Sequence, residues 1–156
     1  MHFEPSDNRI VIWGMSCVGK TTFANTMKSH TYYCFDALFQ WHLIETFGLS
    51  ATENFKYIQR TCDANKFVID GWNLADKKGE FFPNDCTVYI LWAPYEKIIS
   101  QYRVPVLDQL EHKNMYKKWY HEIDISFFPK VKFFLSDDTF QEISKKDYLT
   151  FLEHNQ

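Results

Sequence analysis

The chain has 156 residues, with a hydrophobic fraction of 46%, a charged fraction of 24% and a net charge of −3. Such a composition is typical of a single globular domain with a buried core, so residues 1–156 are expected to form one domain. The negative net charge excludes a general electrostatic attraction to nucleic acid. No apolar run approaches the roughly 20 residues that span a bilayer, so no membrane partner is expected.

The four cysteines give no sign of a metal site or a disulfide framework. Cys17, Cys34, Cys62 and Cys86 form no CxxC pair and have no zinc-finger spacing. No secretory signal stands at the start of the sequence. Because disulfides persist mainly in oxidising compartments, we expect reduced thiols and a cytoplasmic protein.

Short apolar runs alternate with longer helical stretches along the chain. The segments expected as strands are Arg9–Trp13, Thr31–Phe35, Lys66–Asp70, Cys86–Trp92 and Lys130–Leu135. The segments expected as helices are Lys20–His30, Ala37–Phe47, a stretch from Ser50 or Thr52 to about Ala64, one that Pro94 opens, one over about 106–125, and closing helices that include Tyr148–Leu152. The alternation predicts an α/β fold, with a parallel sheet covered by helices on both faces.

Two connections between these elements are expected to be irregular. Leu74–Asp85 is polar and rich in turn residues, so it is expected as a loop. Ser136–Thr139 is expected as a turn whose side chains cap the closing helices. In parallel sheets ligands bind beyond the carboxyl ends of the strands, so residues that follow strands are the first candidates for function.

A phosphate-binding motif follows the first expected strand. The segment Gly14–Thr21 reads GMSCVGKT and fits G-x-x-x-x-G-K-[ST] without a mismatch. Its glycines allow a tight turn with inward N–H groups, and the helix that follows favours negative charge at its N-terminus. Lys20 can reach the β- and γ-phosphates, and the Thr21 hydroxyl can ligate magnesium. The residues expected to hold the nucleotide are Gly14, Met15, Ser16, Cys17, Val18, Gly19, Lys20, Thr21 and Thr22.

Two aspartates end neighbouring strands at the same edge of the expected sheet. Asp70 closes the third strand, where a carboxylate holds magnesium directly or through water. Asp36 follows the second strand, where a carboxylate suits taking the proton of an attacking hydroxyl. The sequence leaves open which aspartate is the base and which holds magnesium. A cap or turn role remains the alternative for each.

Two other classes of nucleotide-binding protein are excluded by their motifs. Asn65-Lys66-Phe67-Val68 begins like the guanine-reading N-K-x-D, but valine stands where the carboxylate must accept from the base. The sequence also has no H-R-D or D-F-G set, which a protein kinase requires.

With these motifs the chain resembles the small P-loop kinases of the P-loop NTPase superfamily, which include nucleoside monophosphate, shikimate, gluconate and polynucleotide kinases. Val68–Asn73 is similar to the Asp-Gly-aromatic segment of nucleoside monophosphate kinases, and Ala93–Glu96 is similar to the start of the family's lid helix. The resemblance implies a three-layer fold with five parallel strands in the order 2-3-1-4-5, and a helical lid over about 94–125. It also implies ATP as donor, Mg²⁺, and a purine near Ser136–Phe140.

The resemblance further implies roles for single residues. Lys20, Asp36 and Arg103 would be catalytic, with Arg103 in the place of a lid arginine. Thr21 and Asp70 would hold magnesium. The residues that would bind the acceptor are Asp36, Arg60, Asp70, Gly71, Trp72 and Asn73.

The expected function is transfer of the γ-phosphate of ATP to a hydroxyl or phosphate of a nucleotide, nucleoside or other small acceptor. Only three arginines are present, fewer than nucleoside monophosphate kinases gather around their phosphates. A polynucleotide 5′-hydroxyl kinase is therefore an alternative, in which Lys113–Lys118 would bind the backbone. An NTP-binding regulatory ATPase or switch module is an alternative of another class.

Overall fold

The computed structural model describes residues 2–14, 18–34, 53, 65–70, 86–102, 108–122, 128, 130–137 and 139–154. The strands are β1 Arg9–Trp13, β2 Thr31–Cys34, β3 Phe67–Asp70, β4 Thr87–Trp92, β5 Val131–Ser136 and β6 Phe140–Ile143. The helices are α1 Lys20–Thr26, α5 Tyr95–Tyr102, α6 Gln109–Glu122 and α7 Lys145–His154. The helices expected over Ala37–Phe47 and up to Ala64, and the loop Leu74–Asp85, lie outside the described residues apart from Glu53.

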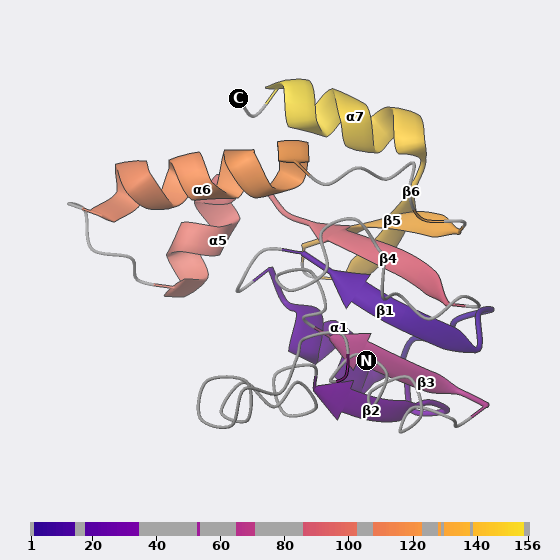
Figure 1. Cartoon of the computed structure of the whole chain (residues 1–156). Helices are drawn as coiled ribbons and strands as arrows, with labels where there is room; N and C mark the ends of the chain where they lie inside the picture. The colour runs from indigo at the N-terminus through magenta and orange to yellow at the C-terminus, as the bar shows by residue number, and fades with distance from the viewer. Residues whose placement is uncertain are drawn as a thin grey trace.

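One mostly parallel sheet forms the centre of the molecule (Figure 1). Its strand order is β2-β3-β1-β4-β5-β6, and β6 runs antiparallel to β5 while the other neighbours are parallel. The expected five-stranded, wholly parallel sheet is therefore wrong, because a sixth strand is added at the edge. Figure 1 also shows α5 and α6 on the side toward which β1 and β2 point.

The sixth strand follows a hairpin turn that the Asp137 side chain helps to close, where the sequence predicted a helix cap. Thr139 donates its backbone N–H to Asp137 Oδ1 at 2.8 Å, and Asp137 donates its own N–H to the Thr139 carbonyl at 3.1 Å. This is the turn chemistry of an aspartate that bonds to the backbone two residues on. The chain then reverses, and Phe140 pairs with Ser136.

The cap of the last helix lies further along the chain than the sequence suggested. Ser144 Oγ accepts the backbone N–H of Asp147 at 3.0 Å, which satisfies one of the N–H groups that the start of α7 leaves unpaired. The helix itself covers the expected Tyr148–Leu152.

The first helix is shorter than the expected Lys20–His30. It ends at Thr26, and Met27 leaves the helical region with φ −87° and ψ 76°.

The strands expected at Arg9–Trp13, Lys66–Asp70, Cys86–Trp92 and Lys130–Leu135 are confirmed within one residue at each end. The helix expected over about 106–125 is confirmed as α6, and α5 begins directly after Pro94.

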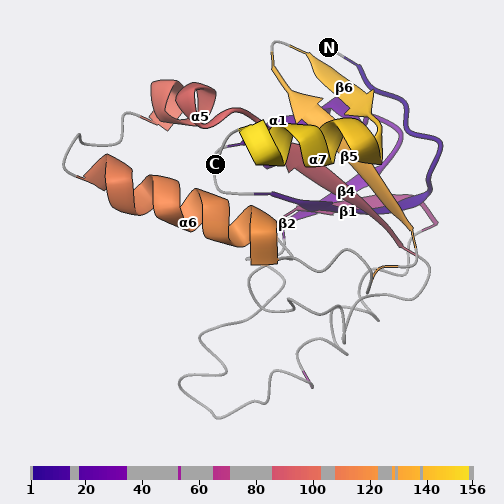
Figure 2. The same ribbon diagram turned by 90° about the horizontal axis from the view of Figure 1, so that it is seen from above.

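Helices cover both faces of the sheet. Phe133 and Phe134 are neighbours in β5, so their side chains point to opposite faces. The Phe134 ring lies 5.1 Å from the ring of Phe23 in α1, and the Phe133 ring lies 4.6 Å from that of Tyr148 in α7. Seen from above, α7 crosses over the strands of this part of the sheet (Figure 2). Strands β3 and β4 are buried at every position, as parallel strands covered on both sides must be.

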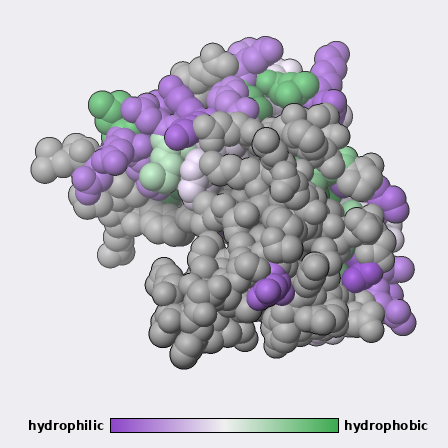
Figure 3. Space-filling model, viewed as in Figure 1, coloured by the Kyte–Doolittle hydropathy of each residue, from purple (hydrophilic) through white to green (hydrophobic). Residues whose placement is uncertain are grey.

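The exposed large hydrophobic side chains of the described residues are Leu110, Met115 and Leu149. On the face drawn in Figure 3, hydrophobic areas of the described residues appear as small spots among hydrophilic ones. Scattered exposure of this kind is normal for a folded domain. None of the described helices combines the length and the apolar character that crossing a bilayer requires.

A half-buried carboxylate joins the segment before β1 to the middle of the sheet. Asp7 accepts hydrogen bonds from the hydroxyls of Tyr89 at 2.5 Å and Thr87 at 3.1 Å, and Lys132 Nζ lies 2.7 Å from its Oδ2. Burial acts to raise the pKa of Asp7, but hydrogen bonds from Lys132, Tyr89 and Thr87 outweigh it and hold the pKa below its ordinary value.

The substitution Asp7→Asn should lower the free energy of unfolding by about 2 kcal/mol at neutral pH, because it weakens hydrogen bonds to a charged group. A carboxyl whose pKa is lower in the folded chain stabilises that chain above the unfolded pKa of about 3.9, and loses this contribution as pH falls further. The difference between wild type and variant should therefore shrink below about pH 4. Urea denaturation across a pH series measures it, with the exposed Glu153→Gln as control. A penalty that does not change with pH would contradict this role of Asp7.

Candidate functional site

The loop after β1 begins at a glycine with no room for a side chain. A Cβ on Gly14 would lie 2.7 Å from the Leu91 backbone oxygen and 2.8 Å from Val18 Cγ1. Real Cβ atoms do not approach other atoms this closely, so only glycine fits without a shift. The close approach of β4 thus fixes the point at which the loop leaves the sheet.

The loop ends at a second glycine, which leads into α1. Gly19 has φ +102°, a left-handed conformation in which other residues are strained. Its carbonyl accepts the backbone N–H of Phe23 at 2.8 Å, the first hydrogen bond of the helix. The two glycines of the motif therefore have separate structural roles. Gly14 allows close packing against β4, and Gly19 adopts a left-handed backbone conformation.

The motif lysine reaches back to the residue that begins the loop. Lys20 Nζ donates to the Gly14 carbonyl at 2.5 Å. This contact places the ammonium group at the start of the loop, on the side where the helix N-terminus already favours anions. Val18 is buried, and Thr22 is exposed on α1. Met15, Ser16 and Cys17 lie outside the described residues.

Two residues that the sequence assigned to magnesium lie in direct contact. Thr21 Oγ1 donates to Asp70 Oδ2 at 2.7 Å, although 49 positions separate them in the sequence. Asp70 is the last residue of β3 and is only 5% exposed. Because β3 pairs with β1, the end of β3 lies beside the start of the phosphate loop.

A third residue of this cluster was missed by the sequence reasoning. Tyr32 of β2 donates its hydroxyl to the same Asp70 oxygen, Oδ2, at 2.7 Å. Burial raises the pKa of Tyr32, and the hydrogen bond to the Asp70 carboxylate raises it further, so the phenol stays a donor. The aromatic and β-branched run predicts the strand itself, but only the strand register shows that Tyr32 lies diagonally beside Asp70.

This cluster has the chemistry that magnesium prefers but too few ligands to hold the ion alone. Within the described part of the chain, no three His, Cys, Asp or Glu side chains gather into a metal site. Magnesium commonly uses one or two carboxylates, waters and substrate phosphates rather than an all-protein cage. The Thr21 hydroxyl and the Asp70 carboxylate beside a phosphate loop fit that pattern.

The second helix of the expected lid is anchored to the sheet. Tyr120 donates its hydroxyl to the Leu91 carbonyl at 2.6 Å, and Tyr116 donates to the Ala93 carbonyl at 2.7 Å. The Tyr120 ring also meets Trp13 edge-on, 5.2 Å between centroids. The carboxyl-terminal half of α6 is thus part of the wall beside Gly14.

The remaining predicted site residues lie outside the described residues. They are Asp36, Arg60, Gly71, Trp72, Asn73 and Arg103. Their roles stay predictions.

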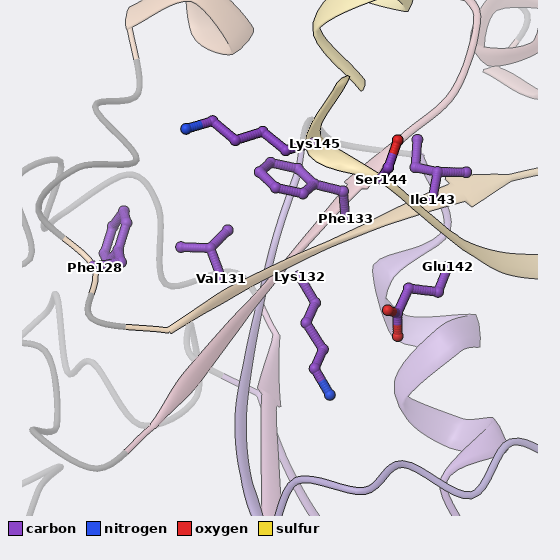
Figure 4. A pocket seen from close by; sticks show the side chains of 8 residues that line it. All are labelled: Phe128, Val131, Lys132, Phe133, Glu142, Ile143, Ser144 and Lys145. Carbon is purple, nitrogen blue, oxygen red and sulfur yellow. The ribbon is translucent and has the colours of Figure 1, made fainter. Parts of the chain in front are cut away.

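A hollow of about 450 Å³ lies at a different place in the sheet (Figure 4). It is lined by residues of β5, β6 and the start of α7, together with Phe128. In Figure 4, Phe133 and Lys145 lie on one side of the β5 ribbon and Lys132 on the other. Val131 begins β5, so this hollow is at the opposite end of the strand from Ser136, whose Oγ would lie 3.3 Å from a Cβ on Gly19. The hollow is therefore separate from the phosphate loop.

No protein-family model matches the chain, and no curated protein matches it by sequence. Among solved structures, an uncharacterized protein from Eubacterium ventriosum ATCC 27560 is 14% identical with a TM-score of 0.53, over 92% of this chain and 97% of that one. A gluconokinase from Sinorhizobium meliloti 1021 is 13% identical with a TM-score of 0.49, over 83% of this chain and 82% of that one. At these identities the first likeness shows a shared fold.

The close packing of Gly14 makes a direct prediction. Gly14→Ala should force position 14 away from the Leu91 backbone and the Val18 side chain, lower the free energy of unfolding by about 1–3 kcal/mol, and weaken nucleotide binding. Thermal melting and calorimetric titration with an ATP analogue measure the two effects. Asn25→Ala, at an exposed position of α1, is the control and should change neither. Wild-type melting and affinity in Gly14→Ala would contradict the packing described for this glycine.

Proposed function

We propose that the chain is an ATP-dependent phosphotransferase of the small P-loop kinase type. It moves the γ-phosphate of ATP to a hydroxyl or phosphate of a nucleotide, a nucleoside or another small acceptor. The observation that carries the proposal is the hydrogen bond from Thr21 to Asp70, next to a loop with the complete phosphate-binding motif. A motif formed by chance has no reason to bring its threonine onto a buried carboxylate at the end of the neighbouring strand.

The donor side of the site is built from Gly14–Thr22. Loop N–H groups and the N-terminus of α1 attract the phosphates, and Lys20 adds a positive charge that can move from the Gly14 carbonyl to a phosphate oxygen. A lysine ammonium is a mobile point charge, so it can follow the phosphate as charge develops during transfer. Phosphoryl transfer depends chiefly on such positioning and neutralisation.

Thr21 and Asp70 are the residues that would hold magnesium. The ion supplies neutralisation of the phosphate oxygens during transfer. The Thr21 hydroxyl donates its hydrogen bond to Asp70, so both lone pairs of the hydroxyl oxygen stay available to a cation. Asp70 is nearly buried, and its negative charge therefore acts with less screening by water than a surface carboxylate would.

Asp36 is proposed as the base on the acceptor side. It follows β2 in the sequence, and β2 and β3 are neighbours in the sheet. The acceptor O–H proton passes to the Asp36 carboxylate as the oxygen bonds to the γ-phosphorus, and the bond between that phosphorus and the bridging oxygen of ADP breaks. Arg103 joins Lys20 in neutralising the transferred group, while Arg60 and Gly71–Asn73 contact the acceptor.

A panel of transfers from labelled ATP tests the proposal. The acceptors are nucleosides, nucleoside monophosphates, sugars and 5′-hydroxyl oligonucleotides, with magnesium present. We expect Mg²⁺-dependent label in one acceptor class, at least about 100-fold reduced in Lys20→Met because the transition state loses its cation. Lys28→Met, which removes an exposed lysine just after α1, is the matched control and should keep wild-type transfer.

The outcomes separate the alternatives. If label appeared only in oligonucleotides, and their binding affinity fell steeply with salt concentration, the chain would be a polynucleotide 5′-hydroxyl kinase instead. Hydrolysis of ATP that no acceptor changes would favour the regulatory ATPase or switch module. Full transfer by Lys20→Met would overturn the phosphotransferase proposal itself.

A further inference from the structure

We propose that Tyr32 is a positioning residue for the magnesium site: its hydroxyl fixes the Asp70 carboxylate in the orientation that presents Asp70 and Thr21 to the cation. This inference rests on the proposed magnesium-dependent function. It adds a residue from β2 to a site otherwise formed by the phosphate loop, α1 and β3.

The cluster joins three elements at one atom. Tyr32 in β2 and Thr21 in α1 each donate a hydroxyl to Asp70 Oδ2, both at 2.7 Å. Asp70 itself ends β3, which lies between β2 and β1 in the sheet. The two donors therefore reach the carboxylate from separate parts of the structure.

A carboxylate held by one donor keeps considerable freedom. The terminal torsion of aspartate is broad and roughly two-fold, so one hydrogen bond allows the oxygens to rock or exchange. Two donors to the same oxygen use both of its principal acceptor directions and fix the plane of the group. Within the described residues Oδ2 accepts both hydrogen bonds, so Oδ1 is the oxygen presented to magnesium or to one of its waters.

The choice of a tyrosine follows from the strand register. Tyr32 is paired with Val68, and Cys34 is the residue directly opposite Asp70. A side chain at position 32 must therefore reach diagonally across two residues of β3, which only a long side chain can do. Phenylalanine would keep the ring and its packing but lose the donor. Tyr32→Phe thus removes the hydroxyl and its hydrogen bond to Asp70 while keeping the ring.

The experiment measures metal binding without turnover. A non-transferable ATP analogue is bound to each protein, Mn²⁺ is titrated as a spectroscopic substitute for Mg²⁺, and bound metal is read by electron paramagnetic resonance at a temperature well below every melting point. We expect Tyr32→Phe to weaken metal affinity about 10–100-fold, the usual effect of losing a partner that orients a ligand. Affinity for the analogue in EDTA should stay at the wild-type value, which also shows that the variant is folded.

A neighbouring tyrosine provides the matched control. Tyr33 follows in β2 and points to the other face, where its ring meets Phe67 edge-on at 6.2 Å. Tyr33→Phe removes the same atom and should leave metal affinity at the wild-type value.

The two proposals fail in different ways. Unchanged metal affinity in Tyr32→Phe, or an equal loss of analogue binding with and without metal, would overturn the positioning role alone. If the wild-type complex bound no metal, the proposed magnesium-dependent function would fail, and the role of Tyr32 would fail with it.

Discussion

The site depends on one carboxylate oxygen that accepts hydrogen bonds from two hydroxyl groups. Asp70 Oδ2 accepts one hydrogen bond from the Thr21 hydroxyl, in the helix after the phosphate loop, and one from the Tyr32 hydroxyl, in β2. Each oxygen–oxygen distance is 2.7 Å. Such bonds to a nearly buried charge are stronger than bonds between neutral groups, and their loss leaves the charge without compensation. The position of the phosphate loop relative to β2 and β3 is therefore tied to the same contact that orients the proposed magnesium ligands.

The sheet explains why this contact can form between residues far apart in the sequence. Parallel pairing of β1 with β3 and of β3 with β2 brings the carboxyl ends of all three strands to one edge. Gly14 lets the loop leave that edge beneath the Leu91 carbonyl, and Gly19 turns it into α1. Tyr120 of α6 contacts the same Leu91 carbonyl, so the wall beside the loop is built from β4 and α6.

Local patterns predicted most of what the described fold confirms. The apolar runs of β1, β3 and β4 predict strands from the local sequence alone, and the two glycines of the loop predict the phosphate loop. Thr21 and Asp70 could be paired in advance because the motif and the strand end constrain each other. Tyr32 could not, since its partner depends on the register between β2 and β3. The sixth strand was also missed, because the Asp137 side chain can cap a helix or close a turn. The packing of Phe140 on Phe23, 4.5 Å between ring centroids, is a tertiary contact that favours the turn and does not show in the local sequence.

The most direct measurement is a crystal structure of the chain with an ATP analogue and Mn²⁺, in which anomalous scattering locates the metal. We expect the triphosphate along Gly14–Thr22, with the metal at Thr21 Oγ1 and at Asp70 either directly or through one water. Tyr32 should keep its bond to Oδ2. A nucleotide bound elsewhere, such as in the hollow beside β5 and β6, or a metal distant from Asp70, would contradict the assignment of this edge of the sheet as the phosphotransfer site.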